Sequence, residues 1–210
     1  MKRLALTLAL VFVFCAEGAF AAPKKGTMTD ARDGESYQTV RIGKQIWMAE
    51  NLKVKTEGNW CYEDKESDCQ KYGWLYNWDA AKAACPVGWH LPSKEEFEIL
   101  FKFVGGAQED AWKWENAGKM LKSTNGWNEY EGKDGNGNDA FGFSALPAGY
   151  RNGYGDFNNE GNRAYFWSST ESVSGSAYYM GLDFRNDDAF LNSFYKTHGF
   201  SVRCVKDNGE

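Results

Sequence analysis

Four cysteines between residues 61 and 204 constrain the fold of this chain more than any other feature of its sequence. Four cysteines permit three disulfide pairings. The short spacing of Cys61 and Cys69 favours a local crosslink across a turn, and Cys85 with Cys204 would then close nearly the whole domain. The alternative is a zinc site, but such a site normally has paired C-x2-4-C spacings, and no two of these cysteines lie that close. We therefore expect two disulfides, Cys61–Cys69 and Cys85–Cys204.

Residues 1–21 have the three-part pattern of a secretory signal. A basic head (MKR) precedes an apolar run of about 11 residues, and residues 19–21 (AFA) place small side chains at the −3 and −1 positions of a signal-peptidase site. We expect cleavage after Ala21, and export into an oxidising compartment agrees with disulfide formation. The alternative is a lipoprotein anchored through Cys15, but Phe14 stands where a lipobox has Gly or Ala.

No other stretch approaches the roughly 18 apolar residues that indicate a transmembrane helix. We therefore expect a mature protein that is secreted, periplasmic or at the bacterial cell surface, with no membrane insertion after signal removal. The formal net charge is −5 and the chain has no basic stripe, which argues against a nucleic-acid partner. With 42% hydrophobic and 25% charged residues, the composition is that of a globular protein.

No internal repeat or composition break divides the mature chain. We predict a short leader over residues 22–30, one domain over residues 31–206 and a C-terminal tail over residues 207–210. A domain of that length is large enough to bury a hydrophobic core of its own.

The first half of the domain contains a hairpin and short helices. Alternating residues predict strands over 37–42 and 45–49, joined by a Gly-Lys turn. Residues 73–78 are aromatic and typical of a strand. A short helix over 80–85 follows, with Asp79 as its expected cap.

The clearest predicted helix begins after Ser93, which forms a capping box with Glu96. Its apolar residues recur at helical spacing, and a Gly pair ends it. A third helix is expected over residues 109–122. The apolar stripe of the Ser93 helix consists of Phe97, Leu100, Phe101 and Val104.

The second half favours strands and loops. Residues 125–162 are rich in Gly and Asn, which indicates long loops with a short strand near 141–144. Further strands are expected over 164–169, 177–184 and 200–205. The sequence therefore predicts an α+β fold with short helices early, mostly antiparallel strands late and long Gly/Asn-rich loops.

Six segments are more distinctive than the overall composition would produce: residues 46–52 (IWMAENL), 75–81 (LYNWDAA), 85–93 (CPVGWHLPS), 142–151 (GFSALPAGYR), 166–171 (FWSSTE) and 199–205 (GFSVRCV). In chain order they resemble the Fibrobacter succinogenes major paralogous domain (FISUMP) family, with a match from about residue 30 to residue 206. The resemblance implies an exported bacterial protein, often attached to the cell surface, of undetermined activity.

A remoter resemblance is to the C-type-lectin-like fold, which includes the formylglycine-generating enzyme group. Residues 88–97 (GWHLPSKEEF) are similar to that group's helix start, and residues 199–204 (GFSVRC) are similar to its terminal strand. In C-type lectins a cysteine near the first helix is bonded to the last strand, which supports the Cys85–Cys204 pairing. The resemblance implies a C-type-lectin-like fold for this chain.

No residue pattern identifies a catalytic site. Formylglycine-generating enzymes use a copper-binding cysteine pair near the C-terminus, where this chain has Cys204 alone. Ser144 does not lie in a G-x-S-x-G motif, and His90 and His198 have no metal-ligand spacing. A hydrolase needs only two carboxylates, which sequence cannot select among 29 acidic residues. We assign no catalytic residue and expect a non-catalytic protein.

Residues 134–139 (DGNGND) suggest calcium as a cofactor. Oxygen ligands alternate with Gly over a flexible loop, as a hard cation prefers. The loop is not an EF-hand, because position six is Asp139 and position twelve is Ala145. The alternative is that Asn, Asp and Gly only build turns. The candidate ligands are Asp134, Asn136, Asn138 and Asp139.

Aromatic and amide side chains near the Gly/Asn-rich stretch are candidates for ligand binding. Aromatic faces beside amides suit sugar rings, although the same rings would also pin long loops onto the core. Our first hypothesis is a non-catalytic binding module for carbohydrate or a cell-surface partner. The alternatives are a structural or adhesive surface protein with a protein partner, and a hydrolase. The candidate ligand-binding residues are Tyr150, Tyr154, Phe157 and Asn158.

Overall fold

The predicted hairpin forms the centre of one sheet. A computed structural model describes residues 22–207, so the predicted signal and Cys15 lie outside the described residues. Strand β2 (Ser36–Ile42) pairs with β3 (Gln45–Met48), with Ile42 opposite Gln45. Gly43 adopts φ +62° in the turn, a left-handed conformation that glycine adopts without steric cost.

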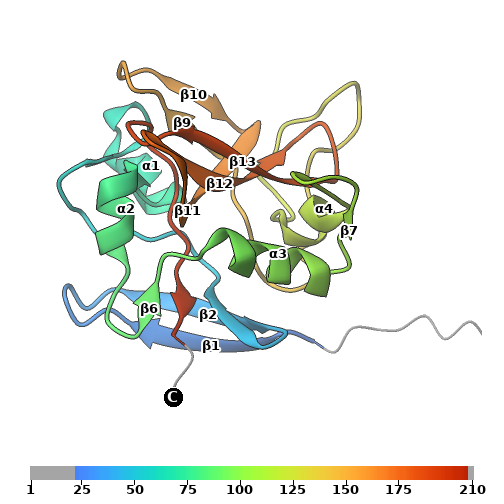
Figure 1. Cartoon of the computed structure of the whole chain (residues 1–210), viewed down its shortest axis with the longest axis horizontal. Coiled ribbons are helices and arrows are strands. Elements are labelled where there is room, and N and C mark those ends of the chain that lie inside the picture. The colour runs from blue at the N-terminus through green and yellow to red at the C-terminus, as the bar shows by residue number, and fades with distance from the viewer. Residues whose placement is uncertain (1–21, 208–210) are drawn as a thin grey trace, which may run out of the picture.

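Both ends of the described chain join this sheet. Strand β1 (Lys24–Thr29), in the segment expected to be a leader, pairs with β2 at one edge. Strand β14 (Val205–Lys206) lies between β3 and β6 (Trp89–His90). The order is therefore β1-β2-β3-β14-β6, and the sheet forms the base of the molecule in Figure 1.

A second five-stranded sheet contains the late strands, in the order β11-β12-β13-β8-β7. The late-strand predictions correspond to β11 (Arg163–Val173) and β12 (Ser176–Asp183). Strand β13 (Ala189–Tyr195) follows β12 and was not predicted. Strands β8 (Lys113–Glu115) and β7 (Ala107–Gln108) complete the sheet. In Figure 1 helix α3 (Lys94–Phe103) lies between the two sheets.

Helix α3 begins as predicted, because Ser93 and Glu96 form the reciprocal capping box. Helix α2 (Trp78–Ala84) is capped by Asn77 and not by Asp79, since the Asn77 side chain accepts from the amide of Ala80. The other short elements are the 3-10 turn η1 (Tyr62–Asp64), α1 (Glu66–Tyr72), α4 (Ala117–Leu121), and the two ribbons β4 (Asn59–Trp60) with β5 (Leu75–Tyr76) and β9 (Ala148–Arg151) with β10 (Phe157–Glu160).

Three predicted elements were wrong. The helix expected over residues 109–122 is strand β8 followed by α4, because Asn116 adopts a left-handed φ of 62° between them. No strand forms over 141–144, where Gly142 and Ser144 also have left-handed φ values. Phe200 and Ser201 form isolated bridges to different neighbours, so that only the end of the predicted terminal strand enters a ladder as β14.

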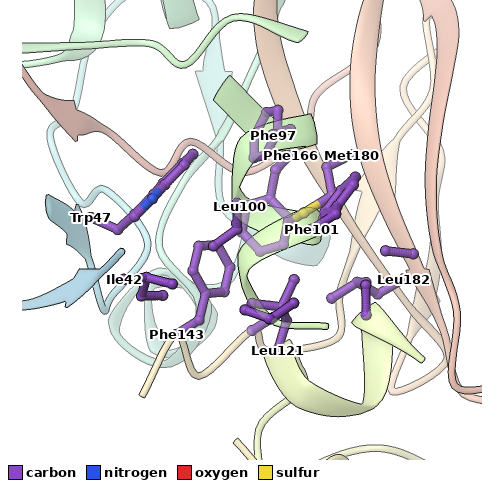
Figure 2. Packing of buried hydrophobic residues seen from close by; sticks show 14 of the residues in the cluster. Ile42, Trp47, Phe97, Leu100, Phe101, Leu121, Phe143, Phe166, Met180 and Leu182 are labelled. Atoms are coloured by element: carbon purple, nitrogen blue, oxygen red, sulfur yellow. The ribbon is translucent and has the colours of Figure 1, made fainter. Parts of the chain in front are cut away.

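The main core lies between the two sheets and α3 (Figure 2). The four apolar residues that the α3 stripe predicted are buried. The Trp47 ring lies 5.4 Å from the Phe97 ring and 5.7 Å from Phe143, and Phe143 lies 5.9 Å from Phe166. Trp47 and Trp167 are fully buried.

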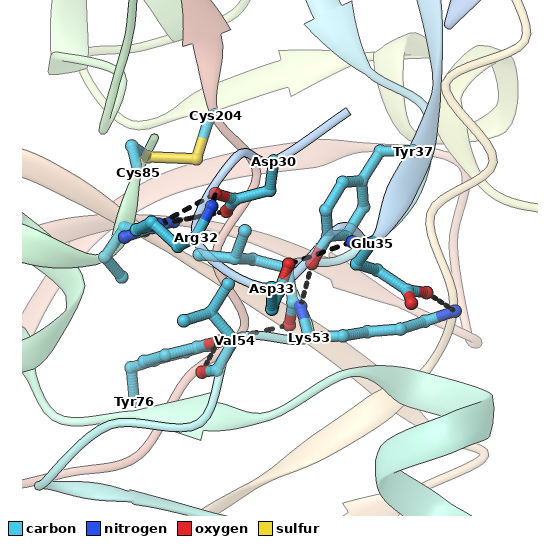
Figure 3. A network of polar contacts seen from close by, with 12 residues as sticks. Asp30, Arg32, Asp33, Glu35, Tyr37, Lys53, Val54, Tyr76, Cys85 and Cys204 are labelled. Atoms are coloured by element: carbon cyan, nitrogen blue, oxygen red, sulfur yellow. Dashed lines mark hydrogen bonds and ion pairs between the residues drawn. A yellow bond between two sulfur atoms is a disulfide. The ribbon is translucent and has the colours of Figure 1, made fainter. Parts of the chain in front are cut away.

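Both predicted disulfides are present, Cys61–Cys69 and Cys85–Cys204. A polar network lies beside the second one (Figure 3). The buried Asp30 carboxylate accepts from Arg32, and Arg32 Nη2 also donates to the carbonyl of Ala84 at 2.7 Å. The turn after β1 is thereby tied to the end of α2, one residue before Cys85.

Three of the family-like segments meet at Arg203, which is fully buried. Its guanidinium donates to Asn51 Oδ1 at 2.8 and 3.0 Å and to the carbonyl oxygens of Phe143 and Ser144. Burial lowers the pKa of Arg203 to about 9. These bonds fix the terminal segment against both the first sheet and the loop that follows α4.

The architecture is mixed α and β, with short helices and antiparallel pairing between all named strands of residues 22–207, as the α+β prediction required. None of the helices in this part of the chain is long and apolar enough to cross a membrane.

Candidate ligand-binding face

The four candidate calcium ligands all act as acceptors within turns. Gly137 shows how tightly this loop packs on α4, because an added Cβ would lie 2.3 Å from the carbonyl of Lys122. The turn-building alternative therefore accounts for the loop, and calcium binding stays a prediction. The side chain of Asp134 accepts from the backbone amide of Asn136, that of Asn136 from Trp127, that of Asn138 from Ala140, and that of Asp139 from Ser144. The Ser144 hydroxyl also donates to Asp139.

The predicted ligand-binding residues lie on two sides of the β9–β10 hairpin. Tyr150 and Asn158 are directly opposite each other in the ladder, and Tyr154 lies at the tip with 97% of its surface exposed. Phe157 instead packs 5.3 Å from the ring of Tyr62, in a small separate cluster. Tyr154 therefore does not pin its loop to the core, whereas Phe157 packs against the body of the protein.

Tyr150 and Tyr154 line one hollow of about 510 Å³, which we call the loop hollow. The turn that carries Tyr154 is built by Asn152, whose Oδ1 accepts from the amides of Tyr154 and Asp156 at 2.9 Å. Gly153 lets this turn approach the 195–198 segment, since an added Cβ would lie 2.9 Å from Thr197 Oγ1. The lining residues are Tyr150, Asn152, Gly153, Tyr154, Phe194, Tyr195, Thr197 and His198.

His198 is the polar group within this aromatic wall. Its side chain is 9% exposed, its ring lies 4.5 Å from Phe194, and it stacks nearly parallel on Tyr150 at 5.9 Å. Burial lowers the pKa of His198, which keeps the ring neutral at neutral pH. Its Nδ1 has no hydrogen-bond partner within residues 22–207. Because this nitrogen is covered by surrounding atoms, it belongs to the packing of the aromatic wall and not to the accessible lining of the hollow.

A second hollow of about 200 Å³ lies on the outward side of β11, β12 and β13, and we call it the sheet hollow. Gly181 forms its floor between Tyr165 on β11 and Phe190 on β13, its two ladder partners. The exposed ring of Trp112 stacks on Phe190 at 5.9 Å. The lining residues are Trp112, Arg163, Tyr165, Tyr179, Gly181, Leu182, Asp183, Arg185, Asn186, Phe190 and Asn192.

The two hollows are connected by aromatic contacts and together form what we call the aromatic face. Tyr179, which lines the sheet hollow, contacts Phe194 of the loop hollow at 6.5 Å between ring centres. Tyr165 likewise contacts Tyr150 at 5.1 Å. Burial raises the pKa of Tyr179 to about 12, so its hydroxyl is neutral and can both donate and accept.

Charged groups gather at one end of the aromatic face. The Asp183 carboxylate, 7% exposed, accepts from Arg185 Nε at 2.9 Å and Nη2 at 2.8 Å and lies 2.7 Å from Arg163 Nε. Burial alone would raise the pKa of Asp183, but the hydrogen bonds from Arg185 and the charge of Arg163 outweigh it and lower the pKa. The carboxylate is therefore ionised at neutral pH.

Two other hollows are lined by fewer aromatic rings. The one between the β2–β3 turn and α3, of about 790 Å³, is largely apolar and is lined by Ile99 and Phe103. The other, of about 370 Å³, is lined mostly by polar and charged side chains, and Tyr72 is its single aromatic residue. We therefore place the candidate site on the aromatic face.

Sequence analysis did not identify most of the residues that line the aromatic face. Tyr179, Gly181 and Asp183 alternate with the buried Met180 and Leu182 on β12, so the alternation itself held the signal. Nothing local indicated that Trp112, Phe194 and His198 would join them. His90, the other histidine, is not part of the aromatic face, because its two ring nitrogens hydrogen-bond to Glu96 and Asp207 at the base sheet.

Within residues 22–207 no three His, Cys, Asp or Glu side chains gather in a way that could hold a metal ion. The sulfurs of the four cysteines are all in disulfides. Binding through aromatic rings, amides and guanidinium groups is the chemistry that the aromatic face offers.

A family model described as Fibrobacter succinogenes major domain matches residues 40–206. No curated protein and no solved structure matches the chain.

Proposed function

Because the chain belongs to the Fibrobacter succinogenes major domain family, whose description specifies no reaction, we propose its function from the aromatic face: an extracytoplasmic, non-catalytic module that binds carbohydrate. The observation that carries this proposal is a connected set of partly exposed rings with polar atoms between them. Aromatic rings stack on the C–H faces of sugars, while the amides and hydroxyls that line the same hollows can exchange hydrogen bonds with sugar hydroxyls.

The extracytoplasmic location is supported by the secretory pattern of residues 1–21 and by two disulfides, which persist in oxidising compartments. The C-type-lectin-like fold belongs to the same proposal. It is supported by the disulfide that joins the end of α2 to the segment before β14, and by strands from both ends of the domain in one sheet. In such an arrangement the sheets form a rigid base and long loops carry recognition.

A second candidate is a protein partner at the cell surface. Tyr154 and Tyr195 are 97% and 64% exposed, and exposed tyrosines are enriched in protein interfaces. This candidate would be favoured if the mature protein captured a surface protein and itself bound no glycan. Turnover of a polysaccharide by the purified protein would instead favour the hydrolase.

The test is binding of the mature protein to cellulose, to hemicelluloses and to a glycan array. We expect retention on at least one glycan, and we expect Tyr154→Ala to weaken it about fivefold to tenfold, as loss of one stacking ring does. Tyr130→Ala is the matched control, because Tyr130 is also exposed but packs on Phe184, away from the lining of both hollows.

Since Tyr154 is almost fully exposed, Tyr154→Ala should leave the melting temperature nearly unchanged. A drop comparable to that of a core variant, with no loss of binding, would refute a ligand-binding role for the tip. Failure of every glycan to bind would overturn the carbohydrate proposal.

Calcium enters the same experiment as a proposed cofactor. EDTA-treated protein should be titrated with calcium in a calorimeter and then retested for glycan binding. Heat of binding that Asp134→Ala with Asp139→Ala abolishes would support the site. Absence of heat would leave these residues with the turn-building role that their hydrogen bonds already explain.

A further inference from the structure

The sheet hollow is shaped by the absence of a side chain on Gly181. A Cβ at this position would lie 3.1 Å from the ring of Tyr179 and 4.0 Å from Phe190 Cβ, so any larger residue would occupy the floor. At about 200 Å³ the hollow is smaller than the usual range of roughly 300–1,000 Å³ for drug-sized ligands. It suits one ring of a ligand, held between Tyr165, Tyr179 and Phe190.

The rim of the sheet hollow carries a positive charge in excess. Arg163 and Arg185 share the single carboxylate of Asp183. The next two acidic residues do not supply a second partner, because Asp187 pairs with Lys119 at 3.1 Å and Asp188 pairs with Lys113 at 3.3 Å. One guanidinium charge therefore stays uncompensated beside an aromatic hollow, on a chain whose net charge is −5.

Both guanidinium groups retain N–H donors for a ligand. Arg185 uses Nε and Nη2 on Asp183, which leaves Nη1 without an acceptor among the described residues. Arg163 uses Nε on Asp183, and Nη1 reaches the Tyr165 hydroxyl only at 3.5 Å. The two side chains are 38% and 44% exposed. Guanidinium donors bind carboxylates with strong, directional hydrogen bonds.

We propose that the sheet hollow binds a sugar ring that carries a carboxylate, a hexuronate unit of an acidic polysaccharide. The ring stacks against the tyrosines over Gly181, and its carboxylate receives the free N–H groups of Arg185 and Arg163. This inference rests on the proposed carbohydrate function and names the class of sugar that the face selects.

The loop hollow extends this site to a chain of sugars. Phe190 pairs with Gly181 and Phe194 pairs with Ala177, so the two rings stand four residues apart along β13, about 13 Å at the rise of an antiparallel strand. Tyr179 and Phe194 bridge the interval. A linear polysaccharide can therefore place an acidic unit over Gly181 and continue toward Tyr154.

The experiment compares a galacturonate tetramer and a glucuronate tetramer with their methyl esters, which have the same rings without the charge. Calorimetric titration of the mature protein should show at least one tetramer binding about tenfold tighter than its ester, as a charge-assisted hydrogen bond gives. The preference should shrink as salt is raised, because Arg163 and Arg185 are partly exposed.

Two variants locate the effect. Arg185→Gln should bring the affinity for the acid down to near that for the ester, so that the difference between the two ligands is lost. Gly181→Val should weaken both ligands by filling the floor, and its φ is not left-handed, so the backbone tolerates the change. Arg41→Gln is the matched control, since it makes the same charge change on β2, outside the aromatic face.

Equal affinity for acid and ester, or an acid preference that Arg185→Gln leaves intact, would overturn this inference while neutral glycan binding kept the proposed function. If neither tetramer nor any neutral glycan bound, the proposed function would fail together with it.

Discussion

The two faces of the β11–β12–β13 sheet are built from the same strands and serve opposite purposes. The inner face presents Phe166, Met180 and Leu182 to the core beneath. The outer face presents Tyr165, Tyr179 and Asp183 to the hollows. Successive residues of a strand point to opposite sides, so one alternating sequence builds both a core and a candidate binding surface.

The two faces differ in the number of polar side-chain atoms that they carry and in how much of each face is covered by other parts of the chain. Phe166 and its neighbours carry no hydrogen-bonding group and are fully buried between the sheet and α3. The outer face is covered at one end only, where Phe200 stacks on Trp167 at 4.3 Å and on Tyr165 at 4.9 Å. The uncovered end holds Gly181, the tyrosine hydroxyls and the arginines. On the outer face Trp167 and Tyr165 are themselves buried in a second core cluster, whereas Tyr179 remains partly exposed beside Gly181.

The largest expected effect is a loss of stability when residues 199–204, which include Phe200 and cover one end of the outer face, are released from their disulfide. Removing the second disulfide by Cys85→Ala with Cys204→Ala should lower the free energy of unfolding by about 5 kcal/mol, since the loop-entropy estimate grows with the closed loop. Here the sequence separation is 119 residues. Cys61→Ala with Cys69→Ala, at a separation of 8, should cost about 2.5 kcal/mol by the same estimate. Urea unfolding measures both.

An equal loss in the two double variants would contradict the chain-entropy account. If the covering segment holds the outer face closed, the Cys85–Cys204 variant should also admit ligands over Trp167, which a titration would detect as altered stoichiometry.

The next effect compares phenylalanines on the two faces. Phe166→Ala removes a fully buried ring and should cost about 3–5 kcal/mol. Phe194→Ala removes a ring that is 39% exposed, so we expect about 1 kcal/mol and weakened glycan binding. Thermal or chemical denaturation of both variants, with the glycan assay, checks the contrast. Similar destabilisation by the two changes would mean that the outer face is core and not a site.

The smallest effect is a difference in pH dependence between the base and the aromatic face. At His90 burial lowers the pKa, but hydrogen bonds with Asp207 and Glu96 outweigh it and raise the pKa above its ordinary value of 6.5. The stabilisation of the folded state by protonated His90 should be fully present below pH 6.5 and should be lost as the pH rises through the raised pKa. At His198 burial lowers the pKa, so stability should fall as pH drops below 6.5 toward the lowered pKa.

Two substitutions separate these contributions. His90→Gln should destabilise the protein more at pH 5.5 than at pH 8, and His198→Phe should remove part of the loss at acidic pH. Denaturant melts over that range measure both slopes. The same sign of slope change in both variants would contradict the opposite environments of the two rings.

Local signals predicted the elements whose cause lies within one stretch of chain. The α3 helix follows from the Ser93–Glu96 box, and the β2–β3 hairpin follows from alternation around Gly43. The helix expected over 109–122 failed because β13 recruits Lys113 and Trp114 into a ladder. Tertiary pairing overrode the helical preference of that segment.

The candidate site was predicted only in part for the same reason. Tyr150 and Tyr154 stood out because they lie in a turn-rich segment, and both line the loop hollow. Phe157 stood out equally but faces Tyr62, since neighbouring residues of a hairpin strand point to opposite sides. No local pattern singled out Arg185, because the role of an arginine depends on the groups that pack around it.

The sequence by itself determined the Cys61–Cys69 crosslink, the α+β class, the hairpin of the base sheet and helix α3, because these follow from cysteine spacing, alternation and capping over short distances. The Cys85–Cys204 pairing was left over by the first crosslink and was supported by the resemblance to C-type lectins. Only the tertiary structure decided which rings became core and which became surface. Strand register sets that choice, and a shift of one residue would exchange the two faces of β11, β12 and β13. The aromatic face exists because the pairing of Gly181 with Tyr165 and Phe190 gathers residues that lie far apart in the chain.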